Sequence, residues 1–459
     1  MSQFAKKHLK LYLLLYFVDL RQNLYFLRQS PFAKSRKKGI VNRNTENHYY
    51  NLLERIMQKK YVKKARTLSC FHKEYDAIIC GGGVAGCAAA IACARNGLKT
   101  ALVENQLLLG GLATSGLVLY YLPLCDGNGK QVIKGLSHTF LERCNEFGPA
   151  EINPNWKKGG NGNRLAAYFS PPAFVMTLDR MMEENGVDVW FDTRITGVKM
   201  AGGKGNRVSR ICVDNKSGHG EISAKVFIDA TGDADLVYFT GRELHQAPNS
   251  RVTWVIERRE KMDSTHFTFG AGVSTLICAE NLNANSVPPG VNGKLVSGYM
   301  METRRKYKEL LDESAKNGED RKSRYPISLP SMAPLRHTRC IMGEYMLEEK
   351  DENASFEDSI GVLTDWRKCS NLMEVPFRAL IPRDLSNVLA AGRTVSAKED
   401  AWEITRVIPC AAMTGEAAGE AANLFIRKKC RSFREMDVKK LQKVLREKYD
   451  FPIHYDEIK

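Results

Sequence analysis

Three glycines and one glutamate carry the clearest chemistry in this sequence. Gly81, Gly83 and Gly86 form the pattern G-x-G-x-x-G, and Glu104 follows eighteen residues after the last of them. In a dinucleotide-binding unit the first glycine permits a tight turn, the second lets the backbone approach a pyrophosphate, and the third lets a helix pack closely on a strand. A carboxylate at this distance accepts hydrogen bonds from ribose hydroxyls. The four residues therefore predict a dinucleotide site.

The residues around these four predict the elements that hold them. Asp76–Cys80 is a short apolar run that predicts a buried parallel strand, and the Ala-rich stretch Ala88–Ala94 predicts a helix lying against it. Gly97 is a plausible helix stop, and Thr100–Val103 predicts the second strand. The free N–H groups and partial positive charge at the N-terminus of this helix suit a diphosphate. The alternative interpretation is a Gly-rich turn without a ligand.

Further segments follow the first one in a fixed order along the chain. They are Leu109–Gly116, Ile228–Asp233, Asn387–Arg393, Arg406–Pro409 and Thr414–Ala422. Together the segments resemble the FAD-dependent oxidoreductase family with a glutathione-reductase-like FAD fold, in particular a bacterial branch resembling the flavin subunit of heterodisulfide reductase. The resemblance covers roughly Tyr75 to Arg427 and favours FAD over NAD, which the glycine motif alone does not decide.

The resemblance implies an α/β fold. We expect a Rossmann-like FAD-binding domain, built from a parallel sheet and a β-meander, with an inserted α+β substrate domain. The expected divisions are a basic N-terminal extension over 1–73, the first part of the FAD-binding domain over 74–238, the substrate domain over 239–380, the second part of the FAD-binding domain over 381–430, and a C-terminal helical tail over 431–459.

The resemblance also implies where FAD binds. Gly110 and Gly111 lie against the ribityl and diphosphate part of FAD in similar families, and Thr114 and Ser115 approach the flavin ring. Both the glycine pair and the Ala-Thr-Gly turn near the adenosine have an alternative interpretation as ordinary turns. The expected cofactor-binding residues are Gly81, Gly83, Val84, Ala85, Gly86, Glu104, Asn105, Gly110, Gly111, Thr114, Ser115, Ile195, Ala230, Thr231, Gly232, Gly392, Arg393, Ala412 and Met413.

A second helix, expected over Ala411–Phe425, bears on the chemistry of the flavin. If it begins beside the ring, its dipole stabilises negative charge at N1 and O2 of the reduced flavin. Backbone N–H groups near Ala412 and Met413 would do this, and Arg406 would add a cation. Gly415 and Gly419 on the same helix also predict close helix packing.

The expected substrate domain offers one candidate site. Arg336 and Arg339 lie three residues apart and flank His337, and the segment resembles an Arg-x-x-Arg segment of the same family. Two such arginines can hold a carboxylate or a phosphate by bidentate hydrogen bonds. With Arg406, these three residues are the predicted catalytic or substrate-binding set. A salt-bridge segment between domains is an equally good interpretation.

The net charge of +16 suggests a nucleic-acid partner at first sight, but its distribution argues against one. Residues 1–73 hold 17 Lys and Arg against 3 Asp and Glu, so the rest of the chain is nearly neutral. Leu11–Val18 is too short to span a bilayer, so we expect no integral membrane segment. Three interpretations of this extension stay open: a helix touching membrane or nucleic acid, a cleaved leader, or a disordered segment.

The twelve cysteines include no C-x-x-C pair. Iron–sulfur and zinc sites lack their usual spacing, and a disulfide framework is not expected in so long a chain. We therefore expect no metal site and a reducing, cytoplasmic location.

The chain has one dinucleotide fingerprint, because the glycines near Gly202 precede no helix. A built-in NAD(P)H domain is therefore not expected, and electrons should come from an organic substrate or a separate electron carrier. The leading hypothesis is an FAD-dependent dehydrogenase or reductase that transfers hydride between flavin and a small organic substrate. The alternatives are a flavin electron-transfer subunit with an iron–sulfur partner, a redox-neutral isomerase or hydratase, and a non-enzymatic flavin-binding protein. The sequence leaves the substrate, the catalytic acid or base and the oligomeric state open.

Overall fold

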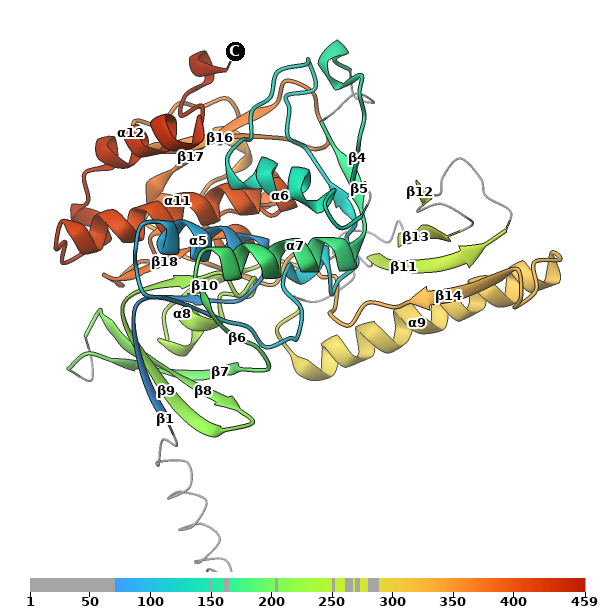
Figure 1. The fold of residues 1–459 in the computed structure, drawn as a ribbon, viewed down its shortest axis with the longest axis horizontal. Coiled ribbons are helices and arrows are strands. Elements are labelled where there is room, and N and C mark those ends of the chain that lie inside the picture. The colour runs from blue at the N-terminus through green and yellow to red at the C-terminus, as the bar shows by residue number, and fades with distance from the viewer. Residues whose placement is uncertain are drawn as a thin grey trace, which may run out of the picture. The chain divides into compact units, whose positions relative to one another are not determined.

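A computed structural model describes residues 71–148, 150–160, 165–202, 205–249, 252–260, 267–268, 273–279 and 289–458 (Figure 1). Most of the basic extension, residues 1–70, lies outside these residues, so its three interpretations stay predictions. Residues 71–73 begin the first strand of the central sheet.

The central sheet has seven strands in the order β6-β2-β1-β9-β8-β7, with β18 also paired with β9. The strands are β1 (Phe71–Cys80), β2 (Thr100–Val103), β6 (Asp188–Trp190), β7 (Arg194–Met200), β8 (Val208–Asn215), β9 (Gly218–Asp229) and β18 (Val388–Ala390). The strands β6, β2, β1, β9 and β18 pair in parallel, whereas β7, β8 and β9 form an antiparallel meander. This topology confirms the predicted parallel sheet with a β-meander.

Alternate residues along the central strands enter two different cores, as the period of a strand requires. On β1, Ala77 and Ile79 belong to the larger core, whereas Ile78 and Cys80 belong to the smaller one. Helices cover the sheet on the side of the larger core (Figure 1). The helices of this part are α5 (Val84–Arg95), α6 (Leu136–Cys144), α7 (Pro171–Glu184), α11 (Ile408–Arg427) and α12 (Val438–Tyr449). The short helix α8 (Asp235–Phe239) packs on β7 and β9 from the side of the smaller core.

Helices α5 and α11 approach each other closely because small residues line their contact. A Cβ on Gly415 would overlap the carbonyl oxygen of Ala85, and one on Gly419 would lie 2.6 Å from the carbonyl oxygen of Ala89. The predicted packing role of both glycines is therefore confirmed. Within the described part of the chain, no helix has both the length and the apolar character needed to cross a membrane.

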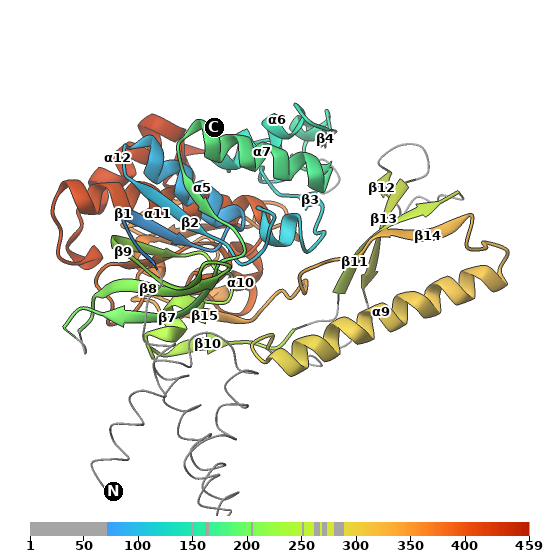
Figure 2. The ribbon, with the colours of Figure 1, turned by 60° about the horizontal axis from the view of Figure 1, so that its bottom comes forward.

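The chain between β9 and β18 builds several smaller sheets. Strands β10 (Leu244–Gln246) and β15 (Arg339–Ile341) pair with each other, and β16 (Ser359–Thr364) pairs with β17 (Leu372–Pro376). A four-stranded sheet has the order β12-β13-β11-β14, with bounds Phe267–Thr268, Val273–Ala279, Val252–Arg259 and Arg324–Ser328. The long helix α9 (Gly293–Lys316) runs along this sheet (Figure 2). Its residues Tyr307 and Leu311 pack with Val255 of β11.

The remaining elements are short. They are β3 (Tyr120–Tyr121), β4 (Ala150–Ile152), β5 (Ala167–Phe169) and α10 (Glu399–Thr405), with single-turn 3-10 helices η1 (Gly111–Ala113), η2 (Trp156–Lys158), η4 (Glu349–Asp351), η5 (Phe377–Leu380), η6 (Gly392–Thr394), η7 (Phe433–Glu435) and η8 (Tyr455–Glu457). Strands β3, β5 and β4 form one small sheet in that order.

The starts of three helices have local causes. Helix α7 begins at Pro171, because a first-turn residue needs no N–H partner and proline has a helical φ. For the same reason α11 begins at Ile408 and contains Pro409 in its first turn. Helix α9 begins at Gly293 because the side chain of Asn292 accepts hydrogen bonds from two N–H groups of the first turn.

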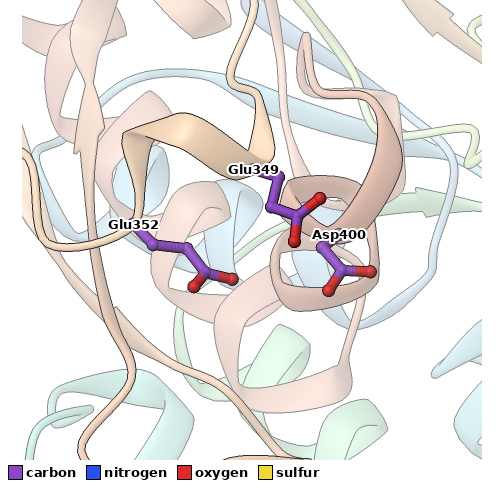
Figure 3. Close-up of side chains that lie close together, drawn as sticks. All are labelled: Glu349, Glu352 and Asp400. Carbon is purple, nitrogen blue, oxygen red and sulfur yellow. The ribbon is translucent and has the colours of Figure 1, made fainter.

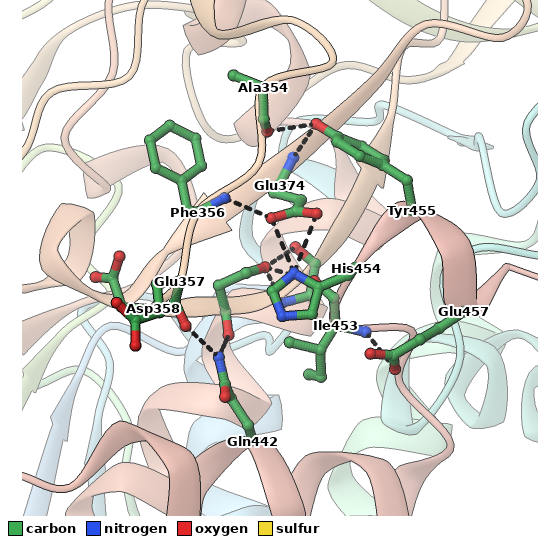
Figure 4. Close-up of polar contacts among 12 residues, drawn as sticks. Ala354, Phe356, Glu357, Asp358, Glu374, Gln442, Ile453, His454, Tyr455 and Glu457 are labelled. Atoms are coloured by element: carbon green, nitrogen blue, oxygen red, sulfur yellow. Dashed lines mark hydrogen bonds and ion pairs between the residues drawn. The ribbon is translucent and has the colours of Figure 1, made fainter.

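A polar network fastens the last residues of the chain to β16 and β17 (Figure 4). Buried Glu374 accepts the N–H of Phe356 at 2.7 Å and lies 3.2 Å from Nδ1 of His454. The hydroxyl of Tyr455 accepts the N–H of Glu374 and donates to the carbonyl of Ala354. The segment after α12 is thus part of the folded body, which the sequence did not predict.

Candidate functional site

The turn after β1 needs glycine at two of its three motif positions for steric reasons. Gly81 has φ of +101°, and a Cβ there would overlap the carbonyl oxygen of Ala230. A Cβ on Gly86 would overlap the carbonyl oxygen of Gly81. These two glycines therefore bring the start of α5 against the ends of β1 and β9, as the sequence predicts.

Gly83 differs from these two because space is open beside it. A Cβ on Gly83 would have no atom within 4 Å, although the backbone of Gly110 pairs with that of Gly83 and a Cβ on Gly111 would lie 3.1 Å from Cα of Gly83. Gly83 is also the N-cap of α5 and has no side chain to cap the helix. The first helical bond joins the N–H of Cys87 to the carbonyl of Gly83, so the N–H groups of residues 84–86 have no intrahelical partner. This open cradle fits the pyrophosphate of a dinucleotide.

Glu104 stands at the end of β2 and braces the same loop. Its carboxylate is 6% exposed and accepts the N–H of Gly82 at 2.6 Å and the N–H of Gln106 at 2.7 Å. Burial raises the pKa of Glu104, and these N–H donors oppose that shift. Each carboxylate oxygen keeps a second acceptor site, so the bracing role is compatible with the predicted ribose contact. Exposed Asn105 follows it.

Replacing Glu104 with alanine is expected to weaken FAD binding by about 1–3 kcal/mol, because charged hydrogen bonds are lost and the Gly82 N–H is left unpaired. Titration of the FAD-free protein with FAD, followed by flavin fluorescence, measures this change. Glu104→Gln keeps an acceptor oxygen and should lose less. Equal affinities for the wild-type protein and both variants would contradict a role for this carboxylate.

The turn after β9 is held by charged side chains. Buried Asp229 accepts the N–H and the hydroxyl of Thr231 at 3.2 Å and 2.8 Å. Arg393 donates to the carbonyl of Gly232 at 2.7 Å and pairs with Asp233 at 2.9 Å. Its third contact is the carbonyl of Leu335. The Arg393 side chain is therefore committed to bracing this turn, so a contact with FAD there would come from the backbone.

Gly392 brings the two helices of the site together. It has φ of +71°, and a Cβ there would lie 2.7 Å from Cβ of Ala85 and 3.4 Å from Cβ of Ala411. Its N–H donates to the hydroxyl of Thr414. The N-termini of α5 and α11 therefore lie side by side, and both present their positive ends to the same region.

The start of α11 shifts the predicted N–H donors. Ala412 and Met413 are buried in the second turn, where N–H groups bond to the preceding turn of the helix. Because α11 begins at Ile408 and Pro409 has no N–H, the groups left for a ligand belong to Ile408 and Cys410. The free N–H groups at the start of α11 thus belong to residues other than those expected, and their effect on the flavin stays a prediction.

Ser115 follows η1 and has an unsatisfied hydroxyl. The residue is 3% exposed, and its Oγ has no hydrogen-bond partner among the described residues. The neighbouring Thr114 hydroxyl instead donates to the carbonyl of Leu109 at 2.5 Å. An unpaired buried hydroxyl is costly, so Ser115 fits a site for a polar ligand atom. The open space at Gly83 and this orphaned hydroxyl are both compatible with FAD at these two predicted positions.

The other predicted positions lie on the scaffold around this cradle. Ile195 is in β7, beyond Thr193, whose N–H donates to the carbonyl of Glu104 at 3.0 Å. The N–H of Ala230 donates to the carbonyl of Cys80 at 2.8 Å and thereby joins the ends of β9 and β1. The structure thus brings the predicted cofactor residues of distant segments into one region.

Of the predicted catalytic or substrate-binding residues, His337 and Arg406 both contact Glu403 of α10. Nε2 of His337 lies 2.9 Å from Oε1 of Glu403, and the other oxygen of Glu403 pairs with Arg406. Burial alone would raise the pKa of Glu403, but Arg406 and His337 outweigh burial and hold it well below its usual range. The His337 ring also packs on Trp402, with centroids 4.7 Å apart. Sequence reasoning missed Glu403, although its i,i+3 spacing to Arg406 was a usable signal.

Arg339 and Arg336 differ in their surroundings. Arg339 pairs with Asp235 at 2.5 Å, donates to the carbonyl of Asp233 at 2.9 Å and stacks on the ring of Tyr238. Arg336 is partly buried and makes no hydrogen bond or ion pair with any residue that the structure describes. Of the two arginines predicted to hold an anion, only Arg336 has a guanidinium available for one.

Three acidic residues, from η4, its C-cap and α10, lie close together (Figure 3). Carboxylate oxygens of Glu349, Glu352 and Asp400 lie within 4.8 Å of one another. Arg367 pairs with Asp400 at 2.9 Å, and Lys368 lies within 3.7 Å of both Asp400 and Glu352. These cations offset the negative charge, so the group is explained as a network of ion pairs.

Comparison with known proteins supplies the family. A family described as FAD dependent oxidoreductase matches residues 76–253 and 257–445. A curated digeranylgeranylglycerophospholipid reductase from Picrophilus torridus is 26% identical over 198 residues, which are 41% of this chain and 48% of that protein. The match therefore spans about half the length of that relative.

Two solved structures are similar at low sequence identity. A geranylgeranyl bacteriochlorophyll reductase-like protein from Thermoplasma acidophilum has a TM-score of 0.47 and 16% identity, over 83% of this chain and 85% of that one. A flavoprotein/dehydrogenase from Cytophaga hutchinsonii has a TM-score of 0.44 and 14% identity, over 81% of this chain and 84% of that one. The family match covers most of the chain, so this chain belongs to the FAD dependent oxidoreductase family, whose cofactor is FAD.

Proposed function

We propose that this enzyme transfers hydride between FAD and a small organic substrate, as a dehydrogenase or reductase. One observation carries the proposal: the segment that bears Arg336 and His337 is fastened to Ser115. The N–H groups of Ser331 and Met332 donate to the carbonyl of Ser115 at 2.9 Å and 3.2 Å. The predicted substrate residues therefore lie on a segment held against the predicted flavin-binding loop.

Different residues of the chain bind the cofactor and set the charge around its flavin ring. Bound FAD supplies the hydride or electron transfer. The N–H groups of residues 84–86 bind the diphosphate, and Glu104 accepts from the ribose. The N-terminus of α11, with Arg406 beside it, favours negative charge on the ring. The curated relative is a reductase by name, which favours electron flow from flavin to substrate.

Anaerobic photoreduction of the FAD-loaded enzyme, followed by mixing with a panel of small organic acceptors, tests the proposal. We expect the visible flavin bands to bleach on illumination and to return when one of the small molecules is added. Return only with an iron–sulfur protein would instead favour an electron-transfer subunit. Substrate turnover with no change in the flavin bands would favour an isomerase or hydratase. A reduced flavin that reacts with none of these partners would contradict an enzymatic redox role.

A further inference from the structure

The backbone around Arg336 is fixed on both sides. Arg393 donates to the carbonyl of Leu335, immediately before Arg336. Immediately after it, the N–H of His337 donates to Oδ1 of Asn249 at 2.7 Å, and Nδ2 of Asn249 donates back to the His337 carbonyl. Asn249 is fully buried. Arg336 is therefore presented from a rigid position, and a rigid position is what a binding residue requires.

Positive charges outnumber negative charges around Arg336. Glu403 is shared between His337 and Arg406, whose side chains are 17% and 14% exposed. Arg336 has no carboxylate of its own among the described residues. Burial and the charge of Arg406 lower the pKa of the Arg336 guanidinium, and Glu403 opposes them only in part. Arg336, Arg406 and Glu403 therefore bring two guanidiniums together with one carboxylate.

An excess positive charge in a partly buried position is costly unless an anion neutralises it. The planar guanidinium of arginine matches a carboxylate or phosphate, which it binds through two parallel hydrogen bonds. Arg339, on the same segment, shows the contrasting case, because Asp235 already neutralises it. Arg336 is thus the member of the pair that needs a partner from outside the described chain.

We propose that Arg336 binds an anionic oxygen group of the substrate, a carboxylate or a phosphate, with Arg406 adding a second positive charge. This inference rests on the proposed function, since it places the anion on the substrate side of the flavin. His337 acts here as a positioning residue. It contacts Glu403, which in turn pairs with Arg406, and it does not contact the anion itself. The substrate class is therefore organic acids or phosphate esters.

Isothermal titration calorimetry on the FAD-loaded enzyme tests this inference. The probes are benzoate, its neutral isostere benzamide, and inorganic phosphate. We expect benzoate or phosphate to bind and benzamide to bind far more weakly. Arg336→Gln should weaken binding of the anion by about ten- to a hundredfold, because charged hydrogen bonds are lost. Arg336→Lys should fall in between, since it keeps the charge but loses the bidentate geometry.

Arg305→Gln is the matched control, because Arg305 lies on α9 with its side chain 58% exposed and pairs with Glu309 at the surface. This variant should bind the probes like the wild-type enzyme. Binding of benzoate alone identifies a carboxylate site, and binding of phosphate alone identifies a phosphate site. Failure of both anions to bind, equal binding of benzamide, or unchanged affinity in Arg336→Gln would overturn the inference.

The same preparations separate this inference from the proposed function. Retention of FAD and its photoreduction are measured beside each titration. Electron exchange with neutral molecules, without binding of either anion, would support the proposed function and contradict the anion site. Binding of benzoate through Arg336, without electron exchange with any small molecule, would support the anion site and contradict the proposed function.

Discussion

Gly83→Val is expected to give a folded protein that no longer binds FAD. The valine side chain would occupy the open space beside α5, which we assign to the pyrophosphate, and it would meet no atom of the protein within 4 Å of its Cβ. The folded chain therefore tolerates the substitution, whereas the cofactor does not. FAD content after purification, together with thermal unfolding of the FAD-free protein, measures the two effects separately.

Gly86→Val is the matched control for this prediction, since Gly86 lies three residues further along the chain, in the first turn of α5. Its Cβ would overlap the carbonyl oxygen of Gly81, so we expect a loss of several kcal/mol in the free energy of unfolding. The two variants should thus fail in different ways, one in cofactor binding and the other in folding. A folded Gly83→Val protein that retains a full complement of FAD would contradict the assignment of the space beside Gly83 to the pyrophosphate of FAD.

Glu416→Gln is expected to change how stability depends on pH. Glu416 lies on α11, is fully buried and accepts the N–H of Leu136 at 2.8 Å through one oxygen, while the other has no partner among the described residues. Burial raises the pKa of Glu416 to about 8, and the hydrogen bond from the Leu136 N–H opposes this shift without cancelling it. The folded state therefore binds a proton between about pH 4.5 and about pH 8 that the unfolded state releases.

It follows that the contribution of Glu416 to stability is fully present below about pH 4.5 and is lost as the pH rises through about 8. The full change corresponds to about 4–5 kcal/mol, because each pKa unit is worth about 1.4 kcal/mol. Glutamine keeps the acceptor oxygen and does not titrate. We therefore expect wild-type protein to lose several kcal/mol more than Glu416→Gln between about pH 5 and about pH 9 in urea unfolding.

Glu447→Gln, at a position on α12 whose side chain is 66% exposed, serves as the control for this experiment. Its pH dependence should follow that of the wild-type protein. Parallel stability curves for the wild-type protein and Glu416→Gln across this pH range would show that Glu416 is ionised in the folded state. In that case its N–H donor would outweigh burial.

Local patterns were enough to predict the strands and glycines of the cofactor domain. Thr100–Val103 is a strand with the predicted bounds, and Gly97 ends α5 with a positive φ. These features depend on neighbours close in sequence: an apolar run, a turn residue, a periodic helix. The role of Gly83 was predictable for the same reason, because the motif itself encodes the approach of the backbone to a pyrophosphate.

The pairing of distant side chains was not predictable in this way. Arg393 braces Gly232 and Asp233, and Arg339 pairs with Asp235, but nothing in the local sequence distinguishes either arginine from a ligand-binding one. Such pairings depend on which loops the fold brings together. Helix α11 begins at Ile408 rather than at the expected Ala411, because Pro409 is accommodated in its first turn.

The site geometry fits the predicted FAD contacts at Gly83 and Ser115. Space is open beside Gly83, and the Ser115 hydroxyl has no hydrogen-bond partner among the described residues.

The visible absorption spectrum of the purified protein, followed by denaturation and identification of the released chromophore, tests the central claim most directly. We predict flavin bands in the spectrum and FAD as the chromophore, either in the protein as purified or after reconstitution of the FAD-free chain. A colourless protein that also fails to take up added FAD would contradict the cradle formed by α5, η1 and α11, and with it the proposed hydride transfer.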